Sequence, residues 1–418
     1  MRFLFLLLSL LLGSGCQASP SPISLTPFPA PAKFDRPFFG MHVHNSGSLR
    51  NWPDIPIGSI RLWDARVNWA SLEPQRGDWK FARLDEFVSW AEEHGVDVLL
   101  PLGVTPRWAS ARPGEKGAYG WGSAAEPSDI ENWRNYVRTV VQRYKGRVAT
   151  YEIWNEANIP SFYSGSVDAL VGLVRVAKEE IDKYDPGVRL LAPSGVGLDK
   201  RVAWPMKILQ AGAADFVDGT SFHLYHSGQA PEAVIAPAMK MKKMLNSAGY
   251  ASLPIWNTES GYWLANSQVQ WSDDEMRNLI SDQRAAEYLP RDMLLARALG
   301  FERYYWYAWD NKKMGFRDPN TGTNRPIAAV LEQFFAILMR STLQRCDRNS
   351  AGLWNCKLTG ANGKPLVALW IDPSADQQQQ QVLAPLPGKS VLLDGDSQWQ
   401  PASAYLTVGP TVVIVSDQ

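Results

Sequence analysis

The most restrictive feature of this chain is a repeated alternation between short apolar runs and longer amphipathic stretches. The apolar runs have the length and composition of β-strands, and they occupy residues 38–43, 59–63, 96–102, 148–154, 189–192, 216–222, 254–258 and 303–309. Between them lie stretches with a helical spacing of apolar residues, among them 84–94, 130–144, 166–184, 230–247 and 281–299. Eight strand–helix units within roughly 300 residues predict an α/β fold, a (β/α)8 TIM barrel, which typically needs about 250 residues.

The structural alternative for such an alternation is a doubly wound open sheet. That fold would place a glycine-rich phosphate-binding turn after its first strand. The first apolar run reads FFGMHVHN, residues 38–45, and lacks such a turn. The sequence therefore favours the closed barrel, which we expect to occupy residues 36–340.

The pattern changes near the C-terminus. Short apolar runs at residues 366–371, 381–383, 391–393 and 411–415 are separated by Pro, Gly and Asp, as in a set of short antiparallel strands. We expect residues 341–418 to form a small C-terminal antiparallel β domain, a β-sandwich-like accessory unit. Because this part has no strong helical pattern and few candidate catalytic groups, we interpret it first as structural support.

The first 16 residues have the pattern of an export signal. Arg2 precedes an apolar run at residues 3–12, which is too short for a membrane-spanning helix of about 20 residues. Small residues then precede Cys16, as in a bacterial lipobox whose cysteine is acylated, although Gly13 stands where Leu is usual. Cleavage near this point without lipidation is the alternative.

The segment that follows predicts a tether. Residues 17–35 are rich in Ser, Pro and Ala and lack apolar periodicity, so we expect a flexible linker. The protein is then expected to be exported, either as a periplasmic protein or as a lipoprotein anchored to a bacterial envelope. Cys346 and Cys356 lie ten residues apart, and two such thiols in an exported protein are expected to pair across a hairpin.

The charge balance excludes some partners. Lys plus Arg and Asp plus Glu number 42 each, so the chain has no basic excess that would attract nucleic acid. We expect no nucleic-acid partner, membrane contact only through an N-terminal lipid anchor, and a monomer. The number of tryptophans, 18, is unusual. It suggests a carbohydrate ligand, because sugar rings stack on flat indole faces.

Two carboxylates stand where strands of the predicted barrel end. The fourth strand runs into YEIWNEAN and reaches Glu156, and the seventh runs into PIWNTES and reaches Glu259. Active residues of such barrels lie at these strand ends, and the two strands face each other across the mouth. A glycosidic bond is broken by one carboxylic acid that protonates the leaving oxygen and a second carboxylate that attacks carbon or activates water. One such glutamate could be a solvated or salt-bridged loop residue, but two, each close to Asn and Trp, indicate catalysis.

These motifs carry a resemblance to a known family. Asn155 and Glu156 on strand four and Glu259 on strand seven resemble the clan A retaining glycoside hydrolases. Over about residues 36–340 the chain is most similar to glycoside hydrolase family 39, in particular to relatives encoded with bacterial exopolysaccharide operons, and EIWNEAN is the most specific stretch. The resemblance implies double displacement with retention. Glu156 would act first as acid and then as base, Glu259 would form a glycosyl ester, and the two carboxyl groups would lie roughly 5–5.5 Å apart.

The resemblance also implies roles for four neighbouring residues. Asn155 matches a residue that bonds the sugar 2-hydroxyl, and Arg61, in SIRLWD on strand two, matches an arginine beside the nucleophile. An adjacent cation lowers the pKa of a carboxyl group and so keeps it ionised. In SFHLYH at the end of strand six, His223 and Tyr225 share one strand face. In the family the tyrosine orients the nucleophile and the histidine lies near the reacting sugar.

Glu152 precedes Glu156 by four residues and has the same strand parity. It is therefore expected to point into the barrel below the mouth. A buried carboxylate must be paired, and Arg61 or Arg66 could supply the charge. We do not expect Glu152 to act directly on substrate.

Two further pairs of residues lie at strand ends. His42 and His44 share one face of strand one and could form half of a metal site. Because no further His or Cys cluster joins them, we expect a substrate subsite there, with no metal and no cofactor. Strand eight offers Trp306 and Trp309 in YYWYAWDN, and the family places a tryptophan here as the floor of the cleavage subsite. The two have opposite parity, and the resemblance favours Trp306.

Aromatic residues also follow several strands as loop residues, and together they suggest a cleft for several sugar units: Trp69, Trp108, Trp121, Tyr163 and Trp263. We therefore expect a retaining endo-β-glycosidase that hydrolyses an extracellular polysaccharide. Two alternatives remain open. An exo-acting β-xylosidase would have a short, blocked pocket, and a non-catalytic carbohydrate-binding or matrix protein would usually lack one of the two carboxylates.

Overall fold

The computed structural model describes residues 22–28, 30–44, 52–266, 269–318, 320–372, 380–383, 390–392, 399–401 and 405–416. The predicted export signal, with Cys16, lies outside the described residues.

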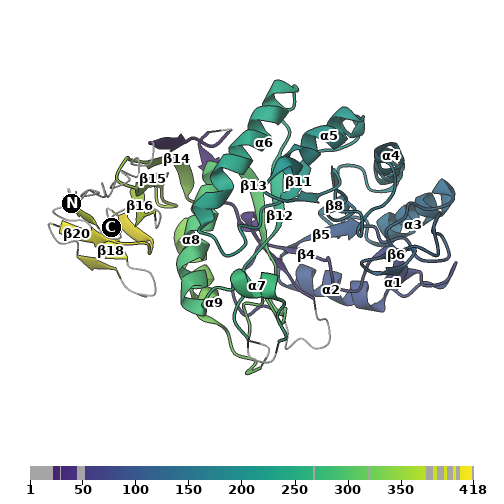
Figure 1. Ribbon diagram of the computed structural model, residues 1–418, viewed down its shortest axis with the longest axis horizontal. Coiled ribbons are helices and arrows are strands. Elements are labelled where there is room, and N and C mark those ends of the chain that lie inside the picture. The colour runs from purple at the N-terminus through teal and green to yellow at the C-terminus, as the bar shows by residue number, and fades with distance from the viewer. Residues whose placement is uncertain are drawn as a thin grey trace, which may run out of the picture.

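Eight strands form a closed parallel barrel (Figure 1). They are β3 (Phe39–His42), β4 (Ser59–Arg61), β5 (Asp97–Leu102), β8 (Thr150–Ile153), β9 (Arg189–Leu191), β11 (Thr220–His223), β12 (Ile255–Ser260) and β13 (Phe301–Trp306). The last strand, β13, pairs with β3 in parallel, and Leu191 at the end of β9 bridges in parallel to Gly219 just before β11. The expected TIM barrel is therefore confirmed. A short strand, β10 (Gly195–Val196), extends the sheet beside β11.

Helices lie around the outside of the barrel (Figure 1). They are α1 (Trp69–Leu72), α2 (Ala82–Glu93), α3 (Ile130–Arg143), α4 (Val167–Tyr184), α5 (Trp204–Gln210), α6 (Ile235–Ser247), α7 (Asp273–Arg277), α8 (Asp282–Ala298) and α9 (Pro326–Leu338). The longest, α4, shows how the sequence forms them. Ser166 caps it by accepting a hydrogen bond from the Ala169 backbone N–H, and Leu170, Val174 and Ile181 form its buried face at helical spacing.

The C-terminal part is an antiparallel sheet at one side of the barrel (Figure 1). Its main strands are β14 (Thr342–Arg348), β15 (Leu353–Thr359), β16 (Pro365–Ile371), β21 (Val413–Ser416), β18 (Ser390–Leu392) and β19 (Gln400–Pro401). A ribbon of β17 (Gln380–Leu383) and β20 (Tyr405–Val408) packs on the sheet, with Val408 against Leu369 and Ile371. The expected small antiparallel domain is confirmed.

The predicted tether differs from what the structure contains. Within it, β1 (Ile23–Leu25) and β2 (Ala32–Lys33) both pair antiparallel with β14 and complete the edge of the C-terminal sheet. Leu25 and Ala32 are buried there. The flexible linker expected over residues 17–35 is therefore wrong for these two stretches, because their partner strand lies more than 300 residues away and leaves no local periodicity.

The predicted disulfide is confirmed. Cys346 and Cys356 stand directly opposite each other in β14 and β15 and are bonded. In the next strand, Trp370 stacks on Trp354 with ring centroids 5.4 Å apart. The Trp370 indole N–H donates a hydrogen bond to Glu232 on the barrel side over 2.8 Å, so the sheet and the barrel share buried contacts.

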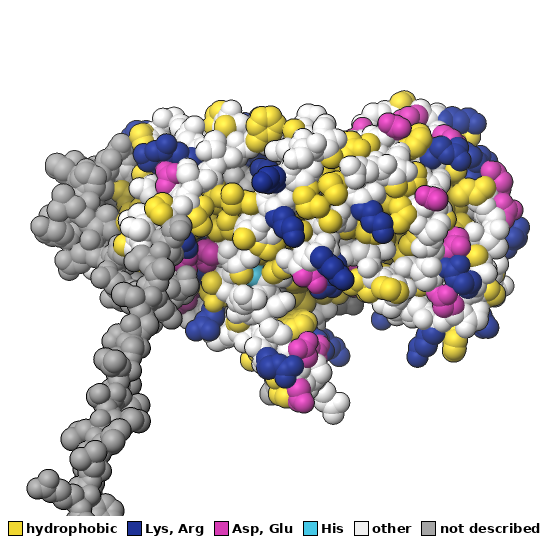
Figure 2. Space-filling model, turned by 45° about the horizontal axis from the view of Figure 1, so that its top comes forward, with side chains coloured by type: hydrophobic (Ala, Val, Ile, Leu, Met, Phe, Trp, Pro, Cys, Tyr) yellow, Lys and Arg dark blue, Asp and Glu magenta, His cyan; other side chains and the backbone are white. Residues whose placement is uncertain are grey.

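On the face shown in Figure 2, basic and acidic side chains are interspersed among hydrophobic ones, and no single sign of charge gathers there. In the described part of the chain, no helix is both long and apolar enough to cross a membrane.

Candidate active site

The mouth of the barrel contains a cavity of about 290 Å³. It lies where β4, β8, β11, β12 and β13 end, the position of active sites in this fold. Its walls are formed by Trp63, Asp64, Tyr119, Asn155, Glu156, Phe162, Tyr225, Ser227, Gly228, Glu259, Gly261, Trp263, Asn278, Tyr307 and Met314.

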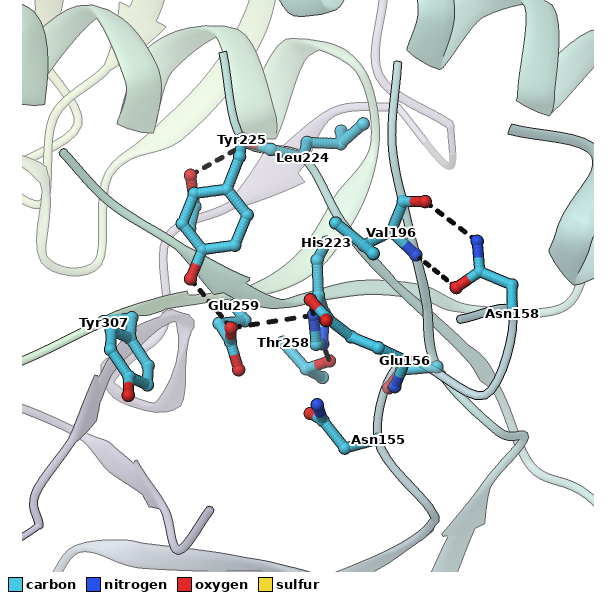
Figure 3. Close-up of polar contacts among 12 residues, drawn as sticks. Asn155, Glu156, Asn158, Val196, His223, Leu224, Tyr225, Thr258, Glu259 and Tyr307 are labelled. Carbon is cyan, nitrogen blue, oxygen red and sulfur yellow. Dashed lines mark hydrogen bonds and ion pairs between the residues drawn. The ribbon is translucent and has the colours of Figure 1, made fainter. Parts of the chain in front are cut away.

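Glu156 and Glu259 face each other in this cavity (Figure 3). Their nearest oxygens, with a ring nitrogen of His223, lie within 4.8 Å of one another. Retaining glycosidases hold their carboxyl groups about 5–5.5 Å apart, whereas inverting enzymes need roughly 6.5–9.5 Å to admit a water molecule. The spacing here is therefore that of direct attack by a carboxylate.

The backbone turns sharply where β8 ends. Trp154 and Glu156 have φ values of 58° and 46°, in the left-handed region that non-glycine residues rarely adopt. The Glu156 backbone N–H donates to the Ser194 hydroxyl over 3.0 Å, which secures the turn. This local strain turns the Glu156 side chain into the cavity, and strained backbone of this kind is typical of functional positions.

Glu259 is held by two donors. Arg61 Nη1 lies 2.9 Å from Oε2, and the Tyr225 hydroxyl lies 2.8 Å from Oε1. Burial raises the pKa of Glu259 to about 7, while His223, Arg61 and Tyr225 act in the opposite direction and the charge of Glu156 adds to the rise. The expected arginine is in place, but its effect is offset by burial.

Glu156 has a different environment. Its Oε1 lies 2.9 Å from His223 Nδ1, and no cation bonds its carboxyl group directly within the described structure. Burial raises the pKa of Glu156 to about 7, with Asp64 adding to the rise and Arg61 and Arg201 opposing it. A carboxyl group with a pKa near neutrality is suited to act as a general acid and base.

Arg61 is the centre of a fully buried network beneath the cavity. Its Nε donates to Glu152 over 2.8 Å, and Nη2 donates to Asn155 Oδ1 over 2.7 Å. Arg61 and Glu152 are both 0% exposed. Glu152 thus lies below the mouth, as its strand parity predicts, and Arg61 rather than Arg66 pairs with it.

Asp64 and Tyr307 belong to the site and were missed by the sequence reasoning. Asp64 accepts hydrogen bonds from the Tyr119 hydroxyl over 2.6 Å and from the Tyr307 hydroxyl over 2.7 Å. All three residues line the cavity. The available signal was the position of Asp64, three residues after Arg61 at the end of strand two.

The two tryptophans expected on strand eight do not line the cavity. Trp306 is 2% exposed and packs against Tyr262, Tyr304 and Phe316. Trp309 is also buried. The expectation that Trp306 forms the floor of the cleavage subsite therefore does not fit, because β13 ends at Trp306 and the next residue, Tyr307, is the one that faces the cavity.

His42 and His44 lie behind the cavity wall. Both rings pack against Tyr307, with centroids 5.1 Å and 4.7 Å from its ring. His42 Nε2 is 3.0 Å from the backbone oxygen of Thr258, and both histidines are buried. Their position supports Tyr307 and is not that of a substrate subsite.

The loop aromatics divide into two groups. Trp263 lines the cavity together with Trp63 and Phe162, which the sequence did not single out. Trp69 is buried in the core, and Trp121 is 54% exposed and is not among the lining residues. Trp108 and Tyr163 pack against neighbouring aromatic rings.

Glu156, His223 and Glu259 also have the geometry of a possible metal site, with ligand atoms within 4.8 Å of one another. Arg61 already bonds Glu259, and its positive charge would repel a metal ion at the same oxygens. The arrangement is better suited to a pair of coupled carboxyl groups, of which one is protonated and the other ionised.

Comparisons with known proteins point to one class of enzyme. Residues 63–166 match the family model described as Glycosyl hydrolase family 10. Endo-1,4-beta-xylanase 4 of Arabidopsis thaliana is 25% identical over 257 residues, which are 57% of this chain and 42% of that protein. The chain spans at most half of the length of the curated relatives that it matches.

Solved structures with the same fold include members of family 39. A family 39 glycoside hydrolase from the gut symbiont Bacteroides cellulosilyticus WH2 is 19% identical with a TM-score of 0.65, covering 92% of this chain and 81% of that one. A family 39 beta-xylosidase from Caulobacter crescentus is 15% identical with a TM-score of 0.65, covering 92% and 97%. The chain is therefore similar to TIM-barrel glycoside hydrolases, in sequence over part of its length and in fold over most of it. The matched family model is that of family 10, while the likeness to family 39 is one of fold.

Proposed function

We propose that this protein is a retaining glycoside hydrolase that acts on a β-linked polysaccharide, with Glu156 as acid and base and Glu259 as nucleophile. The observation that carries the proposal is the approach of the two carboxyl groups to within 4.8 Å in one cavity. The match to the family 10 model and the xylanase relatives support the same reaction class.

The geometry supports a two-step reaction. First, Glu156 gives its proton to the glycosidic oxygen while a Glu259 oxygen attacks the anomeric carbon, so that the carbon–oxygen bond to the leaving group breaks and an ester forms. Then Glu156, now a carboxylate, takes a proton from water, and the water oxygen displaces Glu259 from the same face that the leaving group occupied. Two inversions give net retention.

Arg61, Tyr225 and Asn155 support this chemistry from fixed positions. Arg61 and Tyr225 hold the attacking carboxylate in one orientation. The Asn155 Oδ1 is bonded to Arg61, which leaves its amide N–H group free to face the sugar 2-hydroxyl. Donors fixed in a buried site stabilise developing charge without further reorganisation.

For the substrate, we propose internal cleavage of an extracellular polysaccharide with neutral sugars at the cleavage point. Aromatic side chains from different loops, Trp63, Tyr119, Phe162 and Trp263, offer stacking surfaces. Among the described residues that line the cavity, none is Lys or Arg, so none of these would form an ion pair with a uronic acid.

The second candidate is an exo-acting β-xylosidase. A volume of about 290 Å³ is at the small end of ligand-binding cavities, and a family 39 relative in fold is named a beta-xylosidase. A non-catalytic carbohydrate-binding protein is a third candidate. The presence of both carboxylates argues against it, because such proteins usually lack one of the two.

For localisation, we propose export to a bacterial envelope, with acylation at Cys16. The Cys346–Cys356 disulfide supports an oxidising compartment. Metabolic labelling with a fatty acid, compared between the wild type and Cys16→Ser, tests the anchor.

A fluorinated, mechanism-based β-glycoside tests the enzyme assignment. The wild type is expected to gain one covalently bound sugar on the peptide that contains Glu259, while Glu259→Ala gains none. If neither a xylosyl nor a glucosyl probe labels the wild type, the result would favour the non-catalytic carbohydrate-binding protein. Product sizing on a long polysaccharide then separates the two enzymes, since early release of oligosaccharides indicates endo cleavage and release of monosaccharide alone indicates exo cleavage.

A further inference from the structure

We infer that Thr258 and Glu152, which do not line the cavity, are positioning residues that hold His223 in the tautomer that keeps a proton on Glu156. This inference deepens the proposed hydrolase function and rests on it. Its basis is an unbroken series of buried contacts from the Arg61–Glu152 ion pair to Glu156, and Figure 3 shows the part from Thr258 to Glu156.

Glu152 is the fixed end of the series. Its Oε2 accepts hydrogen bonds from Arg61 Nε at 2.8 Å and lies 2.6 Å from Nη2, with both side chains fully buried. A carboxylate paired with a guanidinium in this way has only acceptor atoms. Its other oxygen, Oε1, therefore needs a donor, and the Thr258 hydroxyl lies 3.0 Å away.

The Thr258 hydroxyl has a single proton to give. Its Oγ1 lies between two partners, Glu152 Oε1 at 3.0 Å and His223 Nε2 at 3.2 Å. Because Glu152 can only accept, the hydroxyl proton points to Glu152, and Thr258 offers a lone pair to the imidazole. The Nε2 atom of His223 must therefore carry a hydrogen.

The other ring nitrogen then has to be an acceptor. His223 is fully buried, and burial lowers its pKa to about 4, so the ring is neutral and holds one proton. With that proton on Nε2, Nδ1 carries only a lone pair. Nδ1 lies 2.9 Å from Glu156 Oε1, and two acceptors do not bond. The proton in this contact consequently belongs to the carboxyl group of Glu156.

Charged and titratable groups from several elements face this contact. Glu259 and Glu152 favour a cationic ring at His223, whereas burial and the charge of Arg61 disfavour it, and burial is the largest effect. Among the described residues, the groups around His223 and Glu156 are Arg61 on β4, Asp64 after β4, Glu152 on β8, His42 on β3, Arg201 in the 3-10 turn Lys200–Ala203, Glu259 on β12, Tyr225 after β11 and Tyr307 after β13.

The arrangement suits both steps of the proposed reaction. In the resting enzyme the proton lies on Glu156 and not on Glu259, which accepts from Arg61 and Tyr225. After Glu156 has passed its proton to the leaving oxygen, its carboxylate faces the bare Nδ1 of His223 and lacks a donor there. Such a carboxylate has a high proton affinity, which favours removal of a proton from water in the second step.

The tautomer can be measured directly in the wild-type protein. The chain has five histidines, so nitrogen NMR of a sample with ¹⁵N-labelled histidine is simple, and the His223 signals are those absent from His223→Gln. We expect a neutral ring with hydrogen on Nε2 at pH 6. Hydrogen on Nδ1, or on both nitrogens, would overturn the inference.

Variants at Thr258 test the consequence for catalysis. Thr258→Val removes the hydroxyl, so His223 is free to place its proton on Nδ1 and donate to an ionised Glu156. The alkaline limb of kcat/KM is then expected to move to lower pH by about one unit, with kcat lowered more than KM is changed. Thr258→Ser restores the hydroxyl and should keep the wild-type profile. Equal profiles in both variants, or equal shifts in both, would contradict the inference.

Failure of the inference and failure of the proposed function are distinguishable. A wild type that hydrolyses no glycoside and takes up no fluorinated sugar disproves the hydrolase, while the NMR measurement still decides the tautomer. An active wild type whose Thr258→Val variant keeps its pH profile disproves only the role of Thr258.

Discussion

Arg61 and Glu259 form a buried ion pair across the barrel, with Nη1 and Oε2 2.9 Å apart although the residues are separated by 198 positions in the chain. The same guanidinium also bonds Glu152 and Asn155. One side chain therefore orients both the proposed nucleophile and the residue that we propose to face the sugar. The pairing fixes Glu259 in the cavity while leaving its Oε1 in contact with Tyr225.

Arg61→Lys is expected to lower kcat/KM by on the order of 10²-fold, the scale seen when one fixed donor to a reacting group is lost. A lysine keeps the charge but cannot bond three partners with a planar fork. The comparison is Arg66→Lys, since Arg66 is exposed and should retain wild-type activity. Initial rates on an aryl glycoside measure both, and similar rates for all three proteins would contradict the role of Arg61.

Azide should restore turnover to variants that lack either carboxylate, and the two glycosyl azide products should have opposite anomeric configurations. In Glu259→Ala, hydrolysis is expected to stop, and azide in the vacated space attacks the anomeric carbon once, which inverts it. In Glu156→Ala, azide attacks the glycosyl ester from the other face, so the product retains its configuration. Proton NMR of the glycosyl azides distinguishes the two. The same configuration from both variants would show that the roles are assigned wrongly.

The activity is expected to follow a bell-shaped pH profile with its maximum near pH 7. Burial raises the pKa of both Glu156 and Glu259 to about 7, and because the two carboxyl groups repel each other when ionised, their protons leave in two steps. Activity falls below the maximum as Glu259 becomes protonated and above it as Glu156 loses its proton. With an activated aryl substrate, Glu156→Gln should lose the alkaline limb alone. A flat wild-type profile from pH 5 to about 9 would refute this.

The same raised pKa values predict a cost in stability. These carboxyl groups have an ordinary pKa of 4.5 in the unfolded chain and a pKa of about 7 in the folded protein. Between pH 4.5 and about pH 7 the folded protein therefore binds more protons than the unfolded chain, and the free energy of unfolding falls as pH rises through this window. Glu156→Gln removes one ionisable group and should exceed the wild type by ~1–3 kcal/mol at pH 8, with little gain near pH 5. Urea unfolding at both pH values measures this, and Glu93→Gln, on an exposed residue, should show no such difference.

The barrel and the meeting of Glu156 with Glu259 were predictable because both follow from repeating rules. Alternating apolar runs specify the strand count, and parallel strands bring their ends to one rim. Strand parity also placed Glu152 below the mouth, where Arg61 meets it. These features depend on positions within regular strands, and the pattern of each strand can be recognised from a short stretch of sequence.

The features that escaped prediction lie where regular strands end or where partners are distant. The choice between Trp306 and Trp309 missed Tyr307, which lines the cavity just after β13 ends at Trp306. The strands β1 and β2 have their partner in β14 at the far end of the chain. The helix α9 was not among the stretches singled out, although Ile327, Leu331, Phe334 and Leu338 form its buried face at helical spacing.

The contact between the C-terminal sheet and the barrel provides a final test. Trp370 is fully buried and donates to Glu232 over 2.8 Å, and Glu232 in turn bonds the buried Arg291. Trp370→Phe is expected to lower the free energy of unfolding by about 2 kcal/mol, since a hydrogen bond to a charged group is lost. The matched control is Trp354→Phe, because Trp354 is stacked on Trp370 and equally buried, but its indole N–H has no hydrogen bond among the described residues.

Trp354→Phe should therefore cost less than Trp370→Phe, and the difference measures the contribution of the hydrogen bond between sheet and barrel. Guanidinium unfolding followed by tryptophan fluorescence and by circular dichroism gives both values. Because Trp370 lies outside the cavity, kcat/KM should stay at the wild-type level in each variant. Equal losses of stability in the two variants would show that ring packing alone, and not the bond to Glu232, joins the two parts of the molecule.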